Sequence, residues 1–553
     1  MGSLENSESE TQSLHSGFFA RYVLSSDHKA VGLQFLALAL FSVILGMSLS
    51  FVMRMHLGNW HRPFTDWLAQ TPERYGALLV FHGSLMVFFV LTAAPQFGFG
   101  HYFLPLQIGA RNMAFPSWSV ASLWMNVGAL AGMTVSFTWA PDSGIVLWLG
   151  SATLFCGAAL LAALNFCVTA IDCRTEGMTF TRLPLTAWSW LITAILSLLI
   201  FSILPAACAL LLSDRFWGTH FFSSAVPVEL VRHAVPGLWQ RWFWFFAQAQ
   251  VYVAMLPCFG IVSHLMSLFS RKPVWKERMA ALALCGVGVF GFCVWGFHMF
   301  SSGLNPNSPL VFSLLASSLG FPAAFLVASW LGTLWNAKPQ LTTSMLFALG
   351  FVSLFLSGGL TGIFLSRSDL AAIAVTNDFV TGHFHLVMGV AATFAILGGF
   401  FFWFPKMFGR KLNEPLGKIH FWLTFAGVYC VFMPMHWLGL LDRGKGIQLQ
   451  GPVAYSGSFG IREFISVATV ITIGAQLFFV VNIVWTLLRG ERVKTKNPWR
   501  ATTLEWFVAS PPVKENFASP PIVYRGAYEI GRPFAGEDFI PQHLAPEQVA
   551  KYR

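Results

Sequence analysis

Charged residues are scarce in this chain. Asp, Glu, Lys and Arg make up 10% of its 553 residues, whereas 55% are hydrophobic and 16% are aromatic. Soluble globular proteins carry about 25% charged residues, so this chain has too few to cover a surface exposed to water. The shortage excludes a soluble enzyme, a nucleic-acid-binding protein and a disordered scaffold. The net charge of +10 is therefore to be explained first by the position of the chain in a membrane, before binding to nucleic acid is considered.

Several familiar motifs are also missing from the sequence. The eight cysteines include no CxxC pair, and nearly all of them fall in or beside apolar segments. They are expected to be small buried hydrophobic residues, which argues against a disulfide framework or a thiolate metal site. We find no internal repeat, phosphate-binding glycine loop or Ser-His-Asp arrangement. No alternating pattern is long enough for the strands of a membrane barrel.

Long apolar runs recur along the whole chain instead. About 20 apolar residues suffice for a helix that crosses a bilayer. Lipid offers no hydrogen-bond partners to the backbone, so a spanning segment must satisfy its own backbone groups by forming a helix. The sequence therefore predicts an all-α membrane protein, a bundle of twelve transmembrane helices. The spans are expected at roughly 30–53, 77–98, 118–139, 145–166, 186–212, 242–266, 279–300, 310–334, 341–365, 379–404, 419–440 and 465–488.

The regions outside the spans indicate the orientation. Loops on the N-terminal side hold more Lys and Arg than the opposite loops, and the tail is also basic, so both termini are expected in the cytoplasm. Residues 1–27 are expected to form a polar N-terminal arm, because they lack the apolar centre of a signal peptide. Residues 28–490 would form the membrane domain. The Pro-rich tail, 491–553, is interpreted as an extended strap or a partner-docking segment.

Histidines inside predicted spans are the main candidates for function, because such side chains are costly at membrane depth. His383 and His385 are two residues apart, so their rings would point to nearly opposite faces of one helix. Each could serve as an axial ligand for a different heme, and His82 could supply a second ligand to one of them. The alternative for any single histidine is a neutral ring bonded to a neighbouring helix. The histidines within spans are His82, His298, His383, His385 and His436.

The sequence around these histidines resembles subunit I of heme-copper oxidases of the cytochrome c oxidase type. The similarity runs in order over about residues 27–513. It is carried by long motifs: Asp27-His28-Lys29, Phe81-His82-Gly83, the stretches from Tyr102 to Arg111 and from Met113 to Pro116, Trp244-Phe245-Phe246, the stretch from Phe259 to His264, His383-Phe384-His385, Trp403 to Met407, His420 to Phe425, and Thr502 to Trp506.

The resemblance implies heme ligands and partners. His82 and His385 would be the axial ligands of a low-spin heme, with Arg54 matching the arginine that bonds the formyl group of heme A. His383 would be the proximal ligand of a second, high-spin heme, near Trp244. Implied partners are subunit II-like and subunit III-like membrane proteins, and a competent subunit I or a larger respiratory complex. The implied location is a bacterial inner membrane.

The chain departs from the family at the copper centre. The family holds copper with one histidine of a His-Pro-Glu-Val-Tyr motif and with a His-His pair. Gln248 and Phe297 occupy two of those positions, so only His298 remains, while Tyr252 is retained. An amide is a poor copper ligand and a phenyl ring is none. We therefore expect the copper site to be lost.

The residues of the family's proton routes are replaced as well. Long-range proton delivery needs titratable groups and polar side chains that hold water, and most of the expected ones are absent. The replacements are Asn112, Ser119, Val120, Gln250 and Leu326 in the proton routes, Val375 and Thr376 at a metal site above the hemes, and Lys445 and Gly446 at the heme propionates.

These losses leave three hypotheses. The first is a heme-bearing subunit of a respiratory electron-transfer complex that neither reduces oxygen nor pumps protons. The second is an active terminal oxidase, from cytochrome c to oxygen, with an atypical active site. The third is a cofactor-free structural subunit. The joint replacement of Gln248, Phe297 and Gln250 disfavours the second, and the survival of the histidines and Arg54 disfavours the third.

Overall fold

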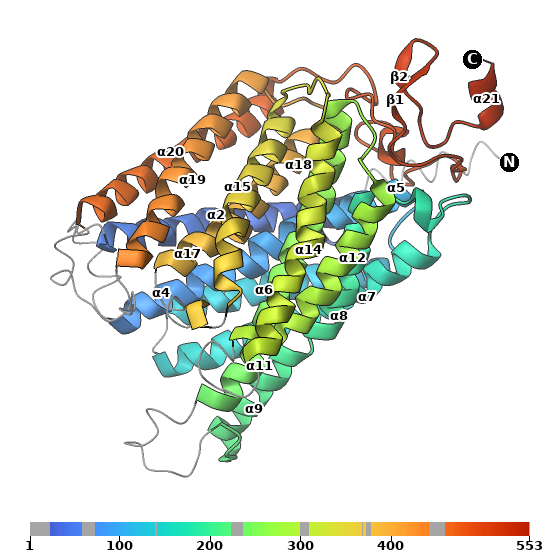
Figure 1. Cartoon of the computed structure of the whole chain (residues 1–553). Helices are drawn as coiled ribbons and strands as arrows, with labels where there is room; N and C mark the ends of the chain where they lie inside the picture. Colours follow the sequence, from blue (N-terminus) through green and yellow to red (C-terminus); the bar gives the residue numbers. More distant parts are fainter. Residues whose placement is uncertain are drawn as a thin grey trace.

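The computed structural model describes residues 23–57, 72–138, 141–222, 236–298, 309–367, 369–371, 378–441 and 459–551. Within these ranges, twelve helices are long and apolar enough to cross a membrane, which confirms the predicted all-α bundle. They run side by side in one tilted bundle (Figure 1).

The first half of the bundle begins with α2 (His28–Leu57). The second span is continuous but irregular, because α4 (Pro72–Ser84) passes into a π-helix, η2 (Leu85–Phe99), and then into α5 (Gly100–Ile108). The following helices are α6 (Pro116–Thr138), α7 (Pro141–Asp172), α8 (Leu185–Ile200) with its continuation α9 (Ile203–Trp217), and α11 (Pro236–Ser270).

The second half begins with α12 (Glu277–Cys293), followed by the 3-10 turn η4 (Val294–Gly296). The tenth span again changes type, from α17 (Asp378–Phe384) to the π-helix η5 (His385–Gly389) and then α18 (Val390–Phe408). The remaining helices are α14 (Pro309–Leu334), α15 (Thr343–Leu365), α19 (Glu414–Leu441) and α20 (Phe459–Arg489).

Most helices extend beyond the apolar runs that predicted them. The run expected at 242–266 lies inside α11, which has 35 residues. At a rise of 1.5 Å per residue, such a helix is longer than the hydrocarbon core is thick. Hydropathy detects only the apolar part of a span, whether it faces lipid or other helices, so the more polar ends that reach the interface are missed.

Small residues let several helices approach closely, as is common where helices pack inside membranes. A Cβ added to Gly32 of α2 would lie 2.8 Å from the carbonyl oxygen of Gly98 in η2. A Cβ on Gly260 of α11 would lie 2.8 Å from the carbonyl oxygen of Leu185 at the start of α8. These glycines place α2, η2, α8 and α11 around the centre of the bundle.

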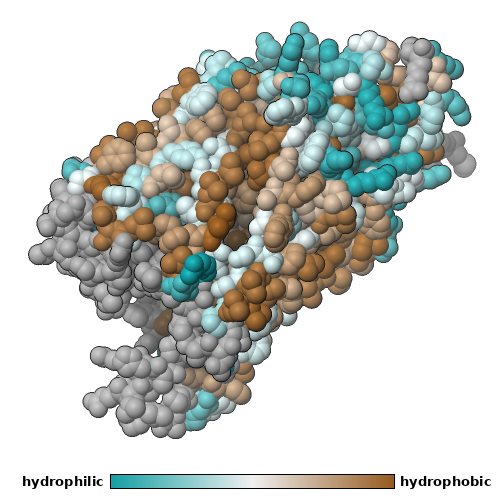
Figure 2. Space-filling model, in the orientation of Figure 1, coloured by the Kyte–Doolittle hydropathy of each residue, from teal (hydrophilic) through white to brown (hydrophobic). Residues whose placement is uncertain are grey.

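The outer surface is apolar where lipid would cover it. On the face seen in Figure 2, hydrophobic side chains cover the spanning helices, and hydrophilic ones gather at the end where the tail lies. On α14, Leu310 is 70% exposed and Phe321 is 77% exposed. Such exposure would be unfavourable in water, but it suits a helix that faces lipid.

The C-terminal tail packs against the end of the bundle at which α2 begins (Figure 1). It contains the 3-10 turn η7 (Leu504–Trp506), an antiparallel hairpin of β1 (Ile530–Phe534) and β2 (Glu537–Phe539), and the short helix α21 (Pro546–Ala550). Arg271, just after α11, donates through Nε to Asp538 Oδ2 at 2.7 Å. The Pro-rich sequence predicts an extended strap or a partner-docking segment and gives no sign of the hairpin.

Candidate cofactor site

The backbone is irregular where the candidate histidines lie. His82 is two residues from the end of α4, just before the π-helix η2, and His385 opens the π-helix η5. In η2, Thr92 Oγ1 donates to the carbonyl oxygen of Val87, five residues earlier, at 2.8 Å. π-helical turns are rare and often occur at functional sites. Hydropathy gives no sign of them, so sequence reasoning missed these turns.

His82 and His385 each have one ring nitrogen fixed by a backbone carbonyl. His82 Nδ1 lies 2.9 Å from the carbonyl oxygen of Gly46 in α2, and His385 Nδ1 lies 2.8 Å from that of Thr381. Because a carbonyl can only accept, both Nδ1 atoms donate, and each Nε2 keeps its lone pair for a metal. The two rings are near enough to interact electrostatically, so the structure brings this predicted pair together.

Close packing holds both rings in place. A Cβ added to Gly46 would lie 2.7 Å from Met86 Sδ and 4.0 Å from His82 Nδ1, so the Met86 side chain beside His82 would have to shift to make room for it. The ring of His385 stacks on Phe432 of α19, with centroids 4.5 Å apart and an interplanar angle of 10°. These contacts fix the orientation of both rings.

Arg54 lies in the last turn of α2, close to His385. It is 8% exposed; its Nη2 contacts Met435 Sδ at 3.6 Å, and its Nη1 has no hydrogen-bond partner. The nearby carboxylate of Asp378 instead pairs with Arg462 at 3.2 Å. A buried guanidinium with an unused N–H is costly unless an acceptor faces it. The position therefore fits a polar group on a bound cofactor, as the sequence predicts.

His383 is anchored on a different helix from His385. Its Nδ1 lies 2.9 Å from Thr361 Oγ1 and 3.1 Å from the carbonyl oxygen of Gly358, both in α15. Because Thr361 Oγ1 itself donates to Gly358 at 2.7 Å, the histidine Nδ1 is the donor and its Nε2 is left available. His383 thus contacts α15, whereas His385 stacks on α19, in agreement with the opposite faces expected for residues two apart.

The side chains at the positions expected for copper ligands make contacts with neighbouring residues. Gln248 Nε2 donates to the hydroxyl of Tyr252 at 3.3 Å. The ring of His298 stacks on Trp244 at a centroid distance of 4.3 Å, and Phe297 meets His298 edge-on at 5.7 Å. In the described part of the chain, no three His, Cys, Asp or Glu side chains are grouped so that they could hold a metal ion.

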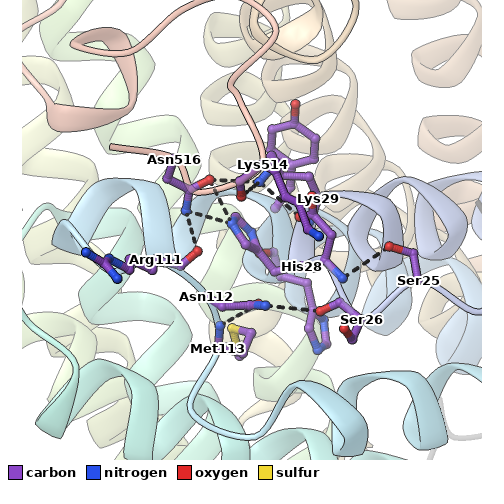
Figure 3. A network of polar contacts seen from close by, with 12 residues as sticks. Ser25, Ser26, His28, Lys29, Arg111, Asn112, Met113, Lys514 and Asn516 are labelled. Carbon is purple, nitrogen blue, oxygen red and sulfur yellow. Dashed lines mark hydrogen bonds and ion pairs between the residues drawn. The ribbon is translucent and has the colours of Figure 1, made fainter. Parts of the chain in front are cut away.

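Residues at the expected proton-route positions take part in structural contacts. Asn112 Nδ2 donates to the carbonyl oxygen of Ser26 at 3.1 Å (Figure 3), Asn165 Nδ2 donates to Ser119 Oγ at 2.9 Å, and Gln250 Nε2 donates to Thr92 Oγ1 at 2.7 Å. Leu326 is fully buried and Val120 is partly buried. Val375, Thr376, Lys445 and Gly446 lie outside the described residues.

Sequence reasoning did not predict the network that joins the tail to the start of the bundle. Lys29 Nζ donates to Asn516 Oδ1 at 2.8 Å, and Asn516 Nδ2 donates to His28 Nε2 at 2.8 Å and to the carbonyl oxygen of Ala110 at 2.9 Å (Figure 3). The Asp27-His28-Lys29 motif therefore serves tail docking. Its partner lies nearly five hundred residues away, and neither hydropathy nor spacing indicates that contact.

Comparison with known proteins supports one family. Residues 30–445 match the family model described as cytochrome c and quinol oxidase polypeptide I. The chain is 39% identical over 561 residues to an alternative cytochrome c oxidase subunit 1 of Bradyrhizobium diazoefficiens, covering 96% of this chain and 94% of the relative. It is 35% identical over 527 residues to cytochrome c oxidase subunit 1 of Synechocystis, covering 91% and 92%.

A third relative and one solved structure agree with this result. Cytochrome c oxidase subunit 1 of Cereibacter sphaeroides is 34% identical over 553 residues, covering 91% of this chain and 96% of the relative. A cryo-EM structure of a heme-copper terminal oxidase dimer superposes with a TM-score of 0.68 at 16% identity, covering 84% of this chain and 85% of that one. At this identity, the superposition supports the fold alone.

Proposed function

Because the chain belongs to the cytochrome c and quinol oxidase polypeptide I family, we propose that it is a heme-bearing subunit of a respiratory electron-transfer complex without a copper centre. In this role it neither reduces oxygen nor pumps protons by itself. Members of the family are integral membrane proteins that bind heme and assemble with other oxidase subunits. The proposal concerns which parts of that machinery this chain retains.

His82 and His385 would hold the retained low-spin heme. Both rings donate through Nδ1 to backbone carbonyls, at 2.9 Å and 2.8 Å, so both Nε2 atoms can face one iron. A heme with two imidazole ligands supplies one-electron transfer. Arg54 would bind the formyl group with its unused Nη1, which favours heme A at this position. The chain's own contribution is to fix both ring tautomers before the heme binds.

His383 would be the only protein ligand of a second, high-spin heme. Thr361 and Gly358 hold its Nδ1 and leave its Nε2 open, and Trp244 and His298 stack in the neighbourhood. Such a heme would have an open coordination position. We propose this second heme as an addition to the first, because the anchoring of His383 is separate from that of His82 and His385.

The observation that carries the proposal is the replacement of two copper ligands. Gln248 uses its amide to donate to Tyr252, and Phe297 has no atom that can bind a metal. His298 alone cannot hold a copper ion. The amides at Asn112 and Gln250, and the apolar side chain of Leu326, also support a loss of proton delivery, because none of them titrates.

One alternative has specific support. The relatives with 34% to 39% identity are named as cytochrome c oxidase subunits, which favours an active terminal oxidase with an atypical site. The cofactor-free structural subunit has no comparable support, because the histidines and Arg54 keep unused polar atoms. The two heme-based functions differ in copper content and in oxygen consumption, both of which can be measured.

Metal and heme analysis of the purified protein tests the proposal. We expect bound heme, a reduced-minus-oxidised spectrum of a six-coordinate heme, and no stoichiometric copper. Copper at about one ion per chain would overturn the proposal in favour of the active oxidase. Absence of any heme would leave only the structural subunit. Oxygen consumption with reduced cytochrome c, measured on the same sample, should stay at background.

The proposed complex and orientation can be tested together. We propose subunit II-like and subunit III-like partners, with a competent subunit I or a larger respiratory complex nearby, in a bacterial inner membrane. The loop charges support cytoplasmic positions for the arm 1–27 and the tail 491–553 around a membrane domain at 28–490. Mass spectrometry after mild solubilisation should identify the partners. Protease treatment of spheroplasts should leave both ends intact.

A further inference from the structure

A second cluster of buried polar groups lies at the tail end of the bundle, away from the candidate heme ligands. Glu505, carried by the tail turn η7, is fully buried and accepts a hydrogen bond from Gln107 Nε2 of α5 at 3.1 Å. Gln107 Oε1 in turn accepts from Thr186 Oγ1 of α8 at 2.6 Å. The tail thus inserts a carboxyl group between two helices of the bundle.

Several polar atoms of this cluster are left without partners. Neither ring nitrogen of His264 in α11 makes a hydrogen bond, although the residue is 3% exposed. Its Nε2 lies 3.9 Å from Glu505 Oε1, which is too long for a direct bond. Glu505 Oε2 and the indole nitrogen of Trp403, whose ring lies beside that of His264, also have no partner. Buried donors and acceptors are normally paired with protein or with ordered water.

Among the described residues, no Lys or Arg side chain forms an ion pair with the Glu505 carboxyl group. Lys406 of α18 is close enough to act on Glu505 electrostatically, but its Nζ donates to the carbonyl oxygens of Lys496, Val508 and Ala509 at 3.2, 2.8 and 3.1 Å. All three of its protons are therefore used on the tail backbone.

The other groups near the carboxyl group are neutral or acidic. Thr503 precedes it in the tail, and the Tyr528 ring lies edge-on to His264 at 5.7 Å, with Glu277 beyond it. Burial therefore raises the pKa of the Glu505 carboxyl above its ordinary value, although Thr503, Gln107 and Lys406 act in the opposite direction. This direction agrees with the geometry, in which a charge on Glu505 would have no direct counter-ion.

We propose that Glu505 and His264 form a hydrated proton-holding site. In this site, buried water bridges the neutral carboxyl group of Glu505 to the imidazole of His264. The bridge holds the tail on the bundle and is called the latch below. A protonated carboxyl group has one O–H to donate, and a neutral imidazole has one nitrogen to accept through water. An ionised carboxylate would instead be buried without a contacting cation, which disfavours the docked tail. The latch does not depend on bound heme.

The sign of the pH dependence follows from this arrangement. In an undocked tail, Glu505 would ionise at its ordinary pKa, whereas in the docked tail it stays protonated to a higher pH. The contribution of Glu505 to docking is therefore fully present below the ordinary pKa. It weakens as pH rises, by up to about tenfold per unit, until the docked carboxyl group also ionises.

Infrared spectroscopy and proteolysis of the full-length protein in detergent test the latch. We expect a carboxylic-acid carbonyl band at neutral pH that disappears in Glu505→Gln. We also expect cleavage of the tail by trypsin to rise with pH in the wild type, after normalisation to an unstructured peptide. Glu505→Gln should remove this rise, because its amide stays neutral at every pH. The exposed residue Glu547 gives the matched control, Glu547→Gln, which should behave as the wild type does.

Two outcomes would overturn the latch. One is a Glu505→Gln variant whose tail cleavage keeps the wild-type pH dependence. The other concerns His264→Gln, which leaves Glu505 in place and so remains informative if Glu505→Gln does not fold. The carbonyl band should shift in His264→Gln because its water-bridged neighbour has changed, and an unshifted band would contradict the pairing.

Discussion

The two ends of the candidate site differ in how their polar atoms are used. On the side of His82 and His385, each ring gives one nitrogen to a backbone carbonyl and keeps the other open, and Arg54 has an unused Nη1. On the side of Gln248, the amide donates to the hydroxyl of Tyr252. The first side keeps polar atoms available for a ligand, whereas on the second side the Gln248 amide is used in a hydrogen bond to Tyr252.

This difference separates a retained site from a replaced one. A binding site keeps its ligand atoms available at some cost in stability, because unpaired buried polar atoms are unfavourable. Once a ligand is no longer bound, selection can replace such atoms with groups that pair internally. The pattern predicts that mutations on the two sides will have different consequences, and the following four experiments are ordered by the size of the effect.

Removal of an axial ligand should have the largest effect. We expect His82→Ala or His385→Ala to weaken heme binding by more than about 100-fold, because no other side chain replaces the lost iron bond. The spectrum of the six-coordinate heme should disappear from the purified variant. His420→Ala is the matched control, since His420 Nε2 is already bonded to Gln476 Oε1 at 2.9 Å. Equal heme loss in that control would mean that the histidines act through folding.

Restoring the missing histidines should convert the second side to a metal site. The double variant Gln248→His/Phe297→His would present three imidazoles together with His298, and we expect it to bind about one copper ion per chain. Elemental analysis after dialysis measures the gain, with Gln248→Ala/Phe297→Ala as the control. If the double variant binds no copper, the loss of these two ligands alone does not explain why the chain lacks a copper site.

A glycine substitution tests the packing that orients His82. We expect Gly46→Ala to destabilise the protein by about 1–3 kcal/mol, because its Cβ would lie 2.7 Å from Met86 Sδ. Heme content should fall with it, since the Gly46 carbonyl fixes the ring of His82. Gly83→Ala, next to His82, has no atom within 4 Å of the added Cβ and should leave thermal stability and heme content nearly unchanged.

The smallest effect is expected at His383. Thr361→Val removes one acceptor of the His383 Nδ1 proton but leaves the Gly358 carbonyl, so we expect a loss of about 1 kcal/mol. Any high-spin heme signal should weaken by a few fold, while the six-coordinate signal persists. Thr134→Val is the control, because Thr134 Oγ1 donates only within its own helix, to Leu130 at 2.8 Å. A change in both heme signals would argue against separate anchoring.

The sequence predicts the bundle well because one physical requirement dominates it. Each apolar run long enough to span a bilayer must be helical, so the count of twelve spans follows without knowledge of tertiary contacts. The opposite directions of His383 and His385 follow from the helical period in the same way. The meeting of His82 with His385 instead came from the resemblance to a family, because no local pattern joins two spans that far apart.

Other features depend on interactions that local patterns do not encode. The π-helix at Leu85–Phe99 changes the directions in which the side chains of its span point, but its residues are as apolar as those of an ordinary helix. The carbonyl of Gly46 receives the His82 ring only because α2 and α4 pack closely there. The docking of Asn516 on His28 and Lys29 joins polar residues separated by every span of the bundle.

That last contact has a consequence for how the protein is made. The hydrogen bond between Asn516 and His28 joins residues 488 positions apart, so the ribosome must translate past the last span before it can form. All twelve helices can enter the membrane while this end of the bundle is still unsealed. A prematurely terminated chain would expose the buried side chains of His28 and Lys29 to the quality-control proteases of the cell. The docked tail thus marks a chain whose membrane spans have all been synthesised.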